Sequence, residues 1–120
     1  MNQDTQLASA LQTAVALTNV SIRPDVADQG DAPPYVVFSE IAMQQGVYTL
    51  SGESSLVPAR YQIDVYATTR QQANAIGAIV IAALVNQFGA VLLNRQSLFE
   101  SDTRLRRVML DVSIWFEQDL

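Results

Sequence analysis

The sequence predicts an α+β domain in which two helices pack on one face of a mainly antiparallel sheet of four to five strands. Three observations predict it. Two segments carry apolar stripes with helical spacing, two segments alternate between apolar and polar residues, and the elements follow the order α-β-β-β-α-β-β. The chain of 120 residues has the length of one domain, so residues 1–120 are expected to share a single core.

The N-terminal helix is expected over residues 4–18. Its apolar stripe recurs every four residues, at Leu7, Leu11 and Val15. Residues 19–34 are expected to form a long connection that ends in two successive prolines. Because proline has no N–H to give to a ladder, the first strand is expected only after Pro34.

The first strand is expected over residues 35–41, which are mostly β-branched or aromatic. Residues 46–50 predict a short second strand, and residues 51–58 combine glycine, serines and proline in the pattern of a mobile loop. Residues 60–67 alternate with a period of two and predict the third strand. One face of this strand holds Tyr61, Ile63, Val65 and Ala67, and the other holds Arg60, Gln62, Asp64 and Tyr66.

A second helix follows and is predicted to end at Phe88. Thr69 and Gln72 have the spacing of a capping box, and Gly89 stands where a left-handed C-cap is expected. Its apolar stripe is Ala73, Ile76, Gly77, Val80, Ala83, Leu84 and Phe88. The remaining chain predicts a hairpin with strands over residues 91–100 and 104–117 and a turn over residues 101–103.

The composition excludes most catalytic chemistry. Histidine and cysteine are both absent, so imidazole and thiolate metal sites and triads that use a histidine base cannot form. The five glycines are scattered and form no phosphate-binding loop. Asp25, Asp28 and Asp31 lack the spacing of a calcium loop and are interpreted as a solvated acidic segment, although a bound cation stays an alternative. We therefore expect no enzyme, no catalytic residue, no metal and no cofactor.

The net charge and the hydropathy of the chain exclude two classes of binding partner, nucleic acids and membranes. The net charge is -5, and all seven basic residues are arginine, so sequence-specific binding of nucleic acid is not expected. The first residues lack the basic stretch of a signal peptide, and the longest apolar run, residues 78–85, is too short to cross a bilayer. We expect a protein that is made in the cytosol, stays soluble and does not bind membranes.

The polar strand faces are the candidate interaction surface, because arginine, methionine and aromatic residues are enriched at protein–protein contacts. The candidates on the third strand are Arg60, Gln62, Asp64 and Tyr66. The candidates at the last strand are Arg104, Arg106 and Trp115. An ordinary solvated sheet face remains the alternative.

Several segments resemble, in this order, the tail terminator family of long-tailed phages and prophages, also called tail-completion or tail-to-head joining proteins. The resemblance covers residues 7 to about 117. It is carried by the run Pro-Tyr-Val-Val-Phe at 34–38, the loop at 48–53, the strand Arg-Tyr-Gln-Ile-Asp-Val-Tyr-Ala at 60–67, and a helix leading to Ala83 and Leu84.

The resemblance implies a structural virion protein that forms a ring, typically a homo-hexamer, at the head-proximal end of the tail. Such a ring stops polymerisation of the tail tube, contacts the tube protein and the head–tail connector, and lets DNA pass through it. The residues expected to order on docking are Ser51, Gly52, Glu53, Ser54 and Ser55. The alternative function is a small α+β module that binds a ligand or peptide as a regulatory subunit.

Overall fold

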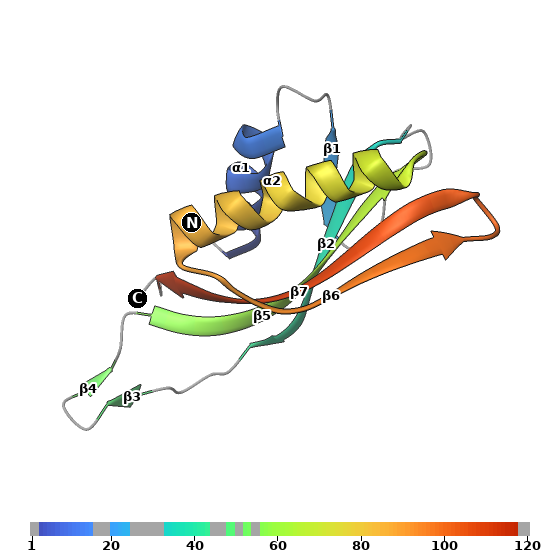
Figure 1. Ribbon diagram of the computed structural model, residues 1–120. Helices are drawn as coiled ribbons and strands as arrows, with labels where there is room; N and C mark the ends of the chain where they lie inside the picture. Colours follow the sequence, from blue (N-terminus) through green and yellow to red (C-terminus); the bar gives the residue numbers. More distant parts are fainter. Residues whose placement is uncertain are drawn as a thin grey trace.

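The computed structural model describes residues 3–15, 20–24, 33–43, 48–49, 52–53 and 56–117, and all statements below concern these residues. Its elements, shown in Figure 1, are α1 (Gln3–Val15), β1 (Ser21–Pro24), β2 (Tyr35–Met43), β3 (Tyr48–Thr49), β4 (Gly52–Glu53), β5 (Leu56–Ala67), α2 (Arg70–Phe88), β6 (Val91–Glu100) and β7 (Leu105–Glu117).

The main sheet has five strands in the order β1-β2-β5-β7-β6. Only β1 and β2 pair in parallel, and the other three pairings are antiparallel. The predicted α+β class with a mainly antiparallel sheet is therefore confirmed. The pairing of β5 with β7 is the longest, running from Leu56↔Glu117 to Ala67↔Arg106.

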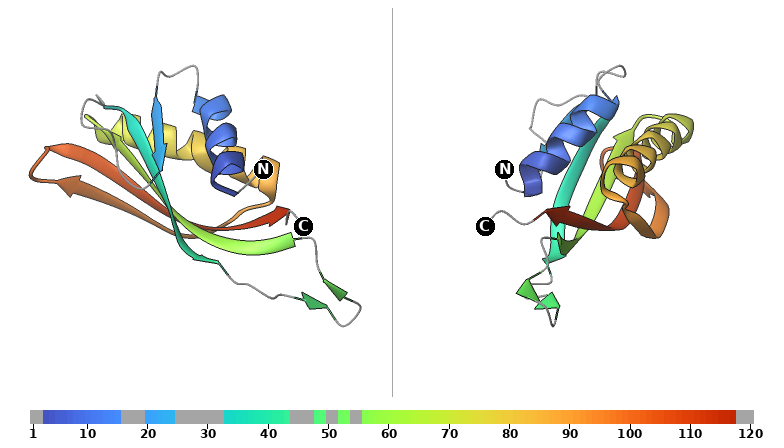
Figure 2. Two further views of the ribbon diagram at one scale, coloured as in Figure 1. Left: turned by 180° about the vertical axis from the view of Figure 1, so that it is seen from behind. Right: turned by 90° about the vertical axis from the view of Figure 1, so that its left-hand side faces the viewer.

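Both helices lie on the same face of the main sheet (Figures 1 and 2). α1 packs against β1 and α2, and α2 packs against β5 and β7. The core lies between these two layers, and its fully buried side chains include Leu7, Leu11, Tyr61, Ile63, Val65, Val80, Leu84, Val108 and Leu110. The predicted inward face of residues 60–67 is confirmed, because Tyr61, Ile63, Val65 and Ala67 are all 0% exposed.

The ends of α2 follow the predicted capping. The Thr69 hydroxyl accepts a hydrogen bond of 3.1 Å from the backbone N–H of Gln72. Gly89 has a φ of 61° and a ψ of 34° and ends the helix in the left-handed region. The N–H groups of Gly89 and Ala90 donate to the carbonyls of Val85 and Leu84, respectively, which satisfies two carbonyls of the last turn.

The predicted connection over residues 19–34 contains a strand that the sequence analysis missed. β1 pairs with β2 from Ser21↔Tyr35 to Pro24↔Phe38, and Val20 and Ile22 are buried. A strand of four residues is too short to show a clear alternation of apolar and polar residues. β1 is therefore recognised only from its pairing with β2, which the sequence pattern does not reveal. The helix predicted over residues 4–18 is confirmed to Val15, and residues 16–18 lie outside the described part of the chain.

The region before the third predicted strand also differs. The expected second strand contributes only Tyr48–Thr49, which pairs with Gly52–Glu53 in a separate two-stranded sheet. Residues 56–58, expected in the mobile loop, are the beginning of β5, because β7 is long enough to pair with them. Of the expected docking residues, Gly52 and Glu53 form β4, whereas Ser51, Ser54 and Ser55 lie outside the described residues.

The last hairpin is confirmed with one shift at its turn. β7 begins at Leu105, and Arg104 belongs to the turn with a φ of 59°. A positive φ is unusual for a residue with a Cβ atom, and it prevents Arg104 from continuing the ladder. In the described part of the chain, no helix combines the length and apolar character needed to cross a bilayer.

Candidate functional site

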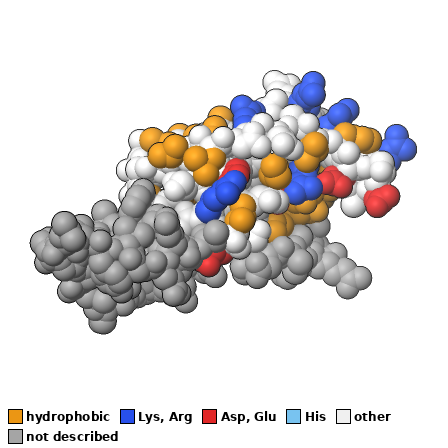
Figure 3. Space-filling model, turned by 90° about the horizontal axis from the view of Figure 1, so that it is seen from below, with side chains coloured by type: hydrophobic (Ala, Val, Ile, Leu, Met, Phe, Trp, Pro, Cys, Tyr) orange, Lys and Arg blue, Asp and Glu red, His pale blue; other side chains and the backbone are white. Residues whose placement is uncertain are grey.

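The face of the sheet opposite the helices is the candidate interaction surface. On β5, the described side chains of this face are Arg60, Gln62, Asp64 and Tyr66, and the register places Asp111 opposite Gln62 and Arg107 opposite Tyr66. Figure 3 views the molecule from below and shows basic, acidic and apolar side chains mixed on its surface. The four candidates of the third strand therefore lie on one face, as predicted.

Two ion pairs join β5 to β7 on this polar face. The Arg60 guanidinium binds the Asp111 carboxylate with two donors, and its Nε lies 3.0 Å from Oδ1. The Arg107 Nε donates to Asp64 Oδ1 at 2.9 Å. Both carboxylates are buried, with exposed fractions of 6% for Asp64 and 9% for Asp111. A buried carboxylate without a partner is costly, so each guanidinium compensates the burial of its aspartate.

The two pairs arise from one repeated pattern. Arg60 precedes Asp64 by four residues on β5, and Arg107 precedes Asp111 by four residues on β7. The antiparallel register is centred on Ile63↔Leu110, so it places each arginine beside the aspartate of the other strand. Each arginine lies diagonally across from its aspartate, two residues away from the directly opposed position, which is within reach of a long side chain.

Further contacts extend the Arg107 pair. Arg107 NH1 donates to Glu100 Oε1 at 3.0 Å, and Gln62 Nε2 donates to Asp64 Oδ2 at 2.9 Å. The Arg107 guanidinium also lies 5.7 Å from the centre of the Tyr66 ring. Arg107, which was not among the sequence candidates, is therefore the centre of the polar network.

The ion pairs and burial raise the pKa values of three side chains on this face. Burial tends to lower the pKa of Arg107, but its hydrogen bonds to Asp64 and Glu100 outweigh this effect and raise the pKa overall. The hydrogen bond to Asp111 raises the pKa of Arg60. Burial raises the pKa of Tyr66, although the neighbouring Arg107 opposes the change. Both guanidinium groups therefore stay charged and the Tyr66 phenol stays neutral at neutral pH.

The other predicted interface residues, Arg104, Arg106 and Trp115, are not placed on this face by the structure. Arg106 neighbours Arg107 on β7 and so points to the opposite side of the sheet, where its guanidinium lies 4.5 Å from the centre of the Phe99 ring. Arg104 lies in the hairpin turn. The backbone of Trp115 pairs with Pro58, and its side chain lies outside the described part of the structure.

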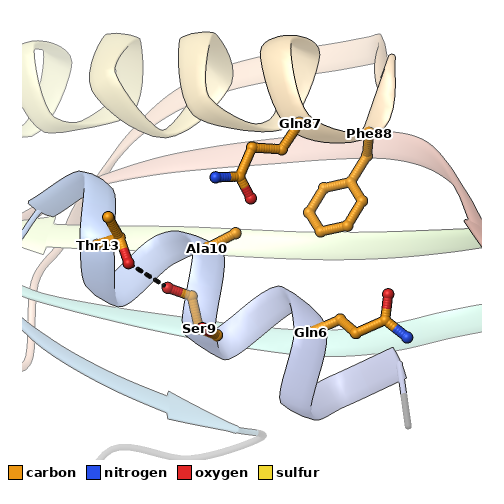
Figure 4. Close-up of a pocket in the computed structure, with 6 residues that line it drawn as sticks. All are labelled: Gln6, Ser9, Ala10, Thr13, Gln87 and Phe88. Atoms are coloured by element: carbon orange, nitrogen blue, oxygen red, sulfur yellow. Dashed lines mark hydrogen bonds between the residues drawn. The ribbon is translucent and has the colours of Figure 1, made fainter. Parts of the chain in front are cut away.

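A hollow of about 230 Å³ lies between the two helices. Figure 4 shows α1 side chains facing Gln87 and Phe88 at the end of α2. The hollow is lined by Gln6, Ser9, Ala10, Thr13, Gln87 and Phe88. The Thr13 hydroxyl donates to the carbonyl of Ser9 at 3.0 Å, as in many helices. None of these lining residues carries an acidic or basic side chain. Within the described residues, no cluster of three or more acidic side chains could hold a metal ion.

A protein-family model matches most of this chain. Residues 5–117 match the model of the family described as "Tail completion protein gp17". No curated protein sequence matches this chain significantly.

Comparison with solved structures supports the fold. A chain of the virion of a native gene transfer agent particle is 20% identical and superposes with a TM-score of 0.63. The alignment covers 94% of this chain and 90% of that one. A crystal structure of a protein from Akkermansia muciniphila aligns over 96% of this chain and 74% of that one, at 8% identity and a TM-score of 0.48.

Proposed function

Because the chain belongs to the family of tail completion proteins, which are structural proteins of phage particles and not enzymes, we propose that its copies form a ring at the head-proximal end of the tail tube. The ring, expected to be a homo-hexamer, stops polymerisation of the tube and joins the tail to the head connector. The match over residues 5–117 is the observation that carries this proposal.

The two edges of the sheet support assembly into a ring. One edge is β1, with four residues, and the other is β6, with ten. A subunit that presents two different surfaces to its neighbours makes head-to-tail contacts, which close into a ring when the rotation between subunits permits it. The two unlike edges give each subunit two different surfaces of the kind that a head-to-tail ring uses.

Three features of the subunit are suited to the other components of the particle, namely the tail tube, the head connector and the DNA. The polar face with Arg60, Gln62 and Tyr66 presents charged and aromatic side chains that suit a protein surface. The β3–β4 segment, with Gly52 and Glu53, is proposed to order against the tube or the connector. The net charge of -5 suits a ring through which DNA passes without binding, because like charges repel the phosphates.

Assembly of the tail tube in vitro tests this proposal. Tube protein from the same genome is polymerised with and without this chain, and tube length and end structure are measured by electron microscopy. We expect shorter tubes that carry a ring at one end. Tubes of unchanged length with bare ends, together with a monomer in analytical ultracentrifugation, would contradict the proposal and favour a small binding module.

A further inference from the structure

β6 is an uncovered edge of the sheet. It pairs with β7 on one side only, and all of its residues except Glu100 are exposed. The helices leave it open, because α1 packs on β1 and α2 packs on β5 and β7. Figures 1 and 2 show β6 at the edge of the sheet away from α1 and β1.

Large apolar side chains collect on this strand. Of the seven that the described residues expose, five belong to β6. Their exposed fractions are 54% for Val91, 39% for Leu92, 49% for Leu93, 39% for Leu98 and 49% for Phe99. Because neighbouring residues of a strand point to opposite faces, these side chains make both faces of β6 apolar. We call these five side chains and the free edge of β6 the edge patch.

Soluble proteins usually protect a free edge with a short strand, a proline, lysines or a bulge. The opposite edge follows this rule, because β1 has four residues and ends at Pro24. β6 has ten residues and contains neither lysine nor proline. It has one bulge, between Leu92 and Asn94, and its arginine, Arg95, donates to Asn74 of α2 at 2.8 Å. The edge patch therefore has the properties of a surface that a partner covers.

The distribution of charge favours a second copy of this chain as that partner. Residues 70–107, which include α2 and β6, hold five of the seven arginines and two of the twelve acidic residues. Residues 1–69 hold two arginines and seven acidic residues. In the sequence, the segment that contains β6 therefore carries a net positive charge and residues 1–69 a net negative one, a difference that favours a head-to-tail contact between two copies.

The size of the edge patch also fits a subunit contact. A strand of ten residues is about 33 Å long, and its two faces and outer edge together are roughly 20 Å across. This gives about 700 Å², close to the about 800 Å² that each partner buries in a stable interface. We propose that β6 is the surface on which the acidic half of the adjacent copy docks, an inference that rests on the ring proposed above.

A charged residue in the edge patch tests this. Val85 on α2 lies outside both the edge patch and residues 1–69, and its exposed fraction is 46% against 49% for Leu93. Leu93→Lys is therefore matched by the control Val85→Lys. Mass photometry and analytical ultracentrifugation are run on the wild type and both variants, and circular dichroism checks that each variant is folded. We expect Leu93→Lys to weaken assembly about tenfold or more and Val85→Lys to leave it unchanged.

The outcomes separate the two proposals. If the wild type forms rings and Leu93→Lys forms them equally well, the inference about β6 is wrong and the ring stands. If Leu93→Lys keeps its rings but no longer caps tubes, β6 contacts the tube protein and the inference is again wrong. If the wild type neither forms rings nor caps tubes, the proposed function fails, and this inference fails with it.

A second experiment measures the accessibility of β6 in the intact ring. The chain has no cysteine, so Leu93→Cys and Val85→Cys each introduce a unique thiol. Reaction with a thiol reagent is followed in the monomer and in the ring. We expect the thiol of Leu93→Cys to be protected in the ring and that of Val85→Cys to react at the same rate in both. Equal reactivity of the Leu93→Cys thiol in monomer and ring would overturn the inference.

Discussion

Arg107 on β7 and Asp64 on β5 form a hydrogen-bonded ion pair of 2.9 Å on the open face of the sheet, with Asp64 almost completely buried. The same arrangement recurs between Arg60 and Asp111. The face that the sequence marks as polar is thus largely occupied by its own contacts. Its exposed groups are available to a partner, but its carboxylates already serve the fold.

The Arg107 pair predicts a large stability effect. Arg107→Ala leaves the buried Asp64 carboxylate without its strongest donor, so we expect a loss of about 3 kcal/mol in the free energy of unfolding. Urea unfolding followed by circular dichroism measures it. The double variant Arg107→Met with Asp64→Leu should recover most of the loss. A change below about 0.5 kcal/mol in the single variant would mean that the pair is not needed.

Arg60 predicts a different result, because half of its side chain is exposed. Arg60→Ala should leave the monomer folded and should cost less stability than Arg107→Ala, while weakening assembly. Sedimentation velocity of the variant, compared with its melting curve, separates the two effects. The same outcome is expected for Trp115→Ala. Unfolding of the domain by either change would place that residue in the core.

Two glycines predict opposite effects of the same substitution. Gly89→Ala puts a Cβ atom on a residue with a φ of 61°, where nothing lies within 4 Å, so only backbone strain of about 1 kcal/mol is expected to destabilise the fold. Gly77→Ala lies inside α2 and gains about 1 kcal/mol of helix propensity, against one contact of 3.4 Å to Val108 Cγ1. Thermal melts of both variants test this, and equal losses of stability would contradict it.

Tyr66 predicts a loss of stability in alkali. Its pKa is raised in the folded protein, mainly by burial, so its contribution to stability is complete below the ordinary tyrosine pKa of about 10. The contribution is lost as the pH rises through the folded value, because the unfolded chain ionises first. The ultraviolet absorbance of phenolate should show a late step that is missing in Tyr66→Phe. Titration of all tyrosines at or below about pH 10 would refute the shift.

Local patterns predicted much of the fold because their signals are complete within one segment. Thr69, Gln72 and Gly89 mark the ends of α2 by backbone chemistry that needs no partner. The alternation in residues 60–67 identified the buried face because the pleat fixes which side chains share a side. Local pattern does not decide whether Trp115 belongs to a subunit interface, because that depends on which other surface packs against it.

The candidate site was predicted less completely. Arg60, Gln62, Asp64 and Tyr66 lie on one face as their spacing requires, whereas Arg104 and Arg106 lie elsewhere. The turn takes Arg104 out of the strand, and alternation sends Arg106 to the other side of the sheet. The spacing of four residues between arginine and aspartate is visible in the sequence on both strands. Which arginine pairs with which aspartate depends on the register between β5 and β7.

By itself, the sequence determined the α+β class, the limits of the second helix, the inward face of the third strand and the exclusion of histidine and cysteine chemistry. Each of these follows from residue identity or from a period within one segment. Only the tertiary structure decided that β1 joins the sheet beside β2, that Arg107 pairs with Asp64, and that β6 is left as an open apolar edge. These depend on which distant segments become neighbours, and a free edge exists only relative to the strands and helices that do not cover it.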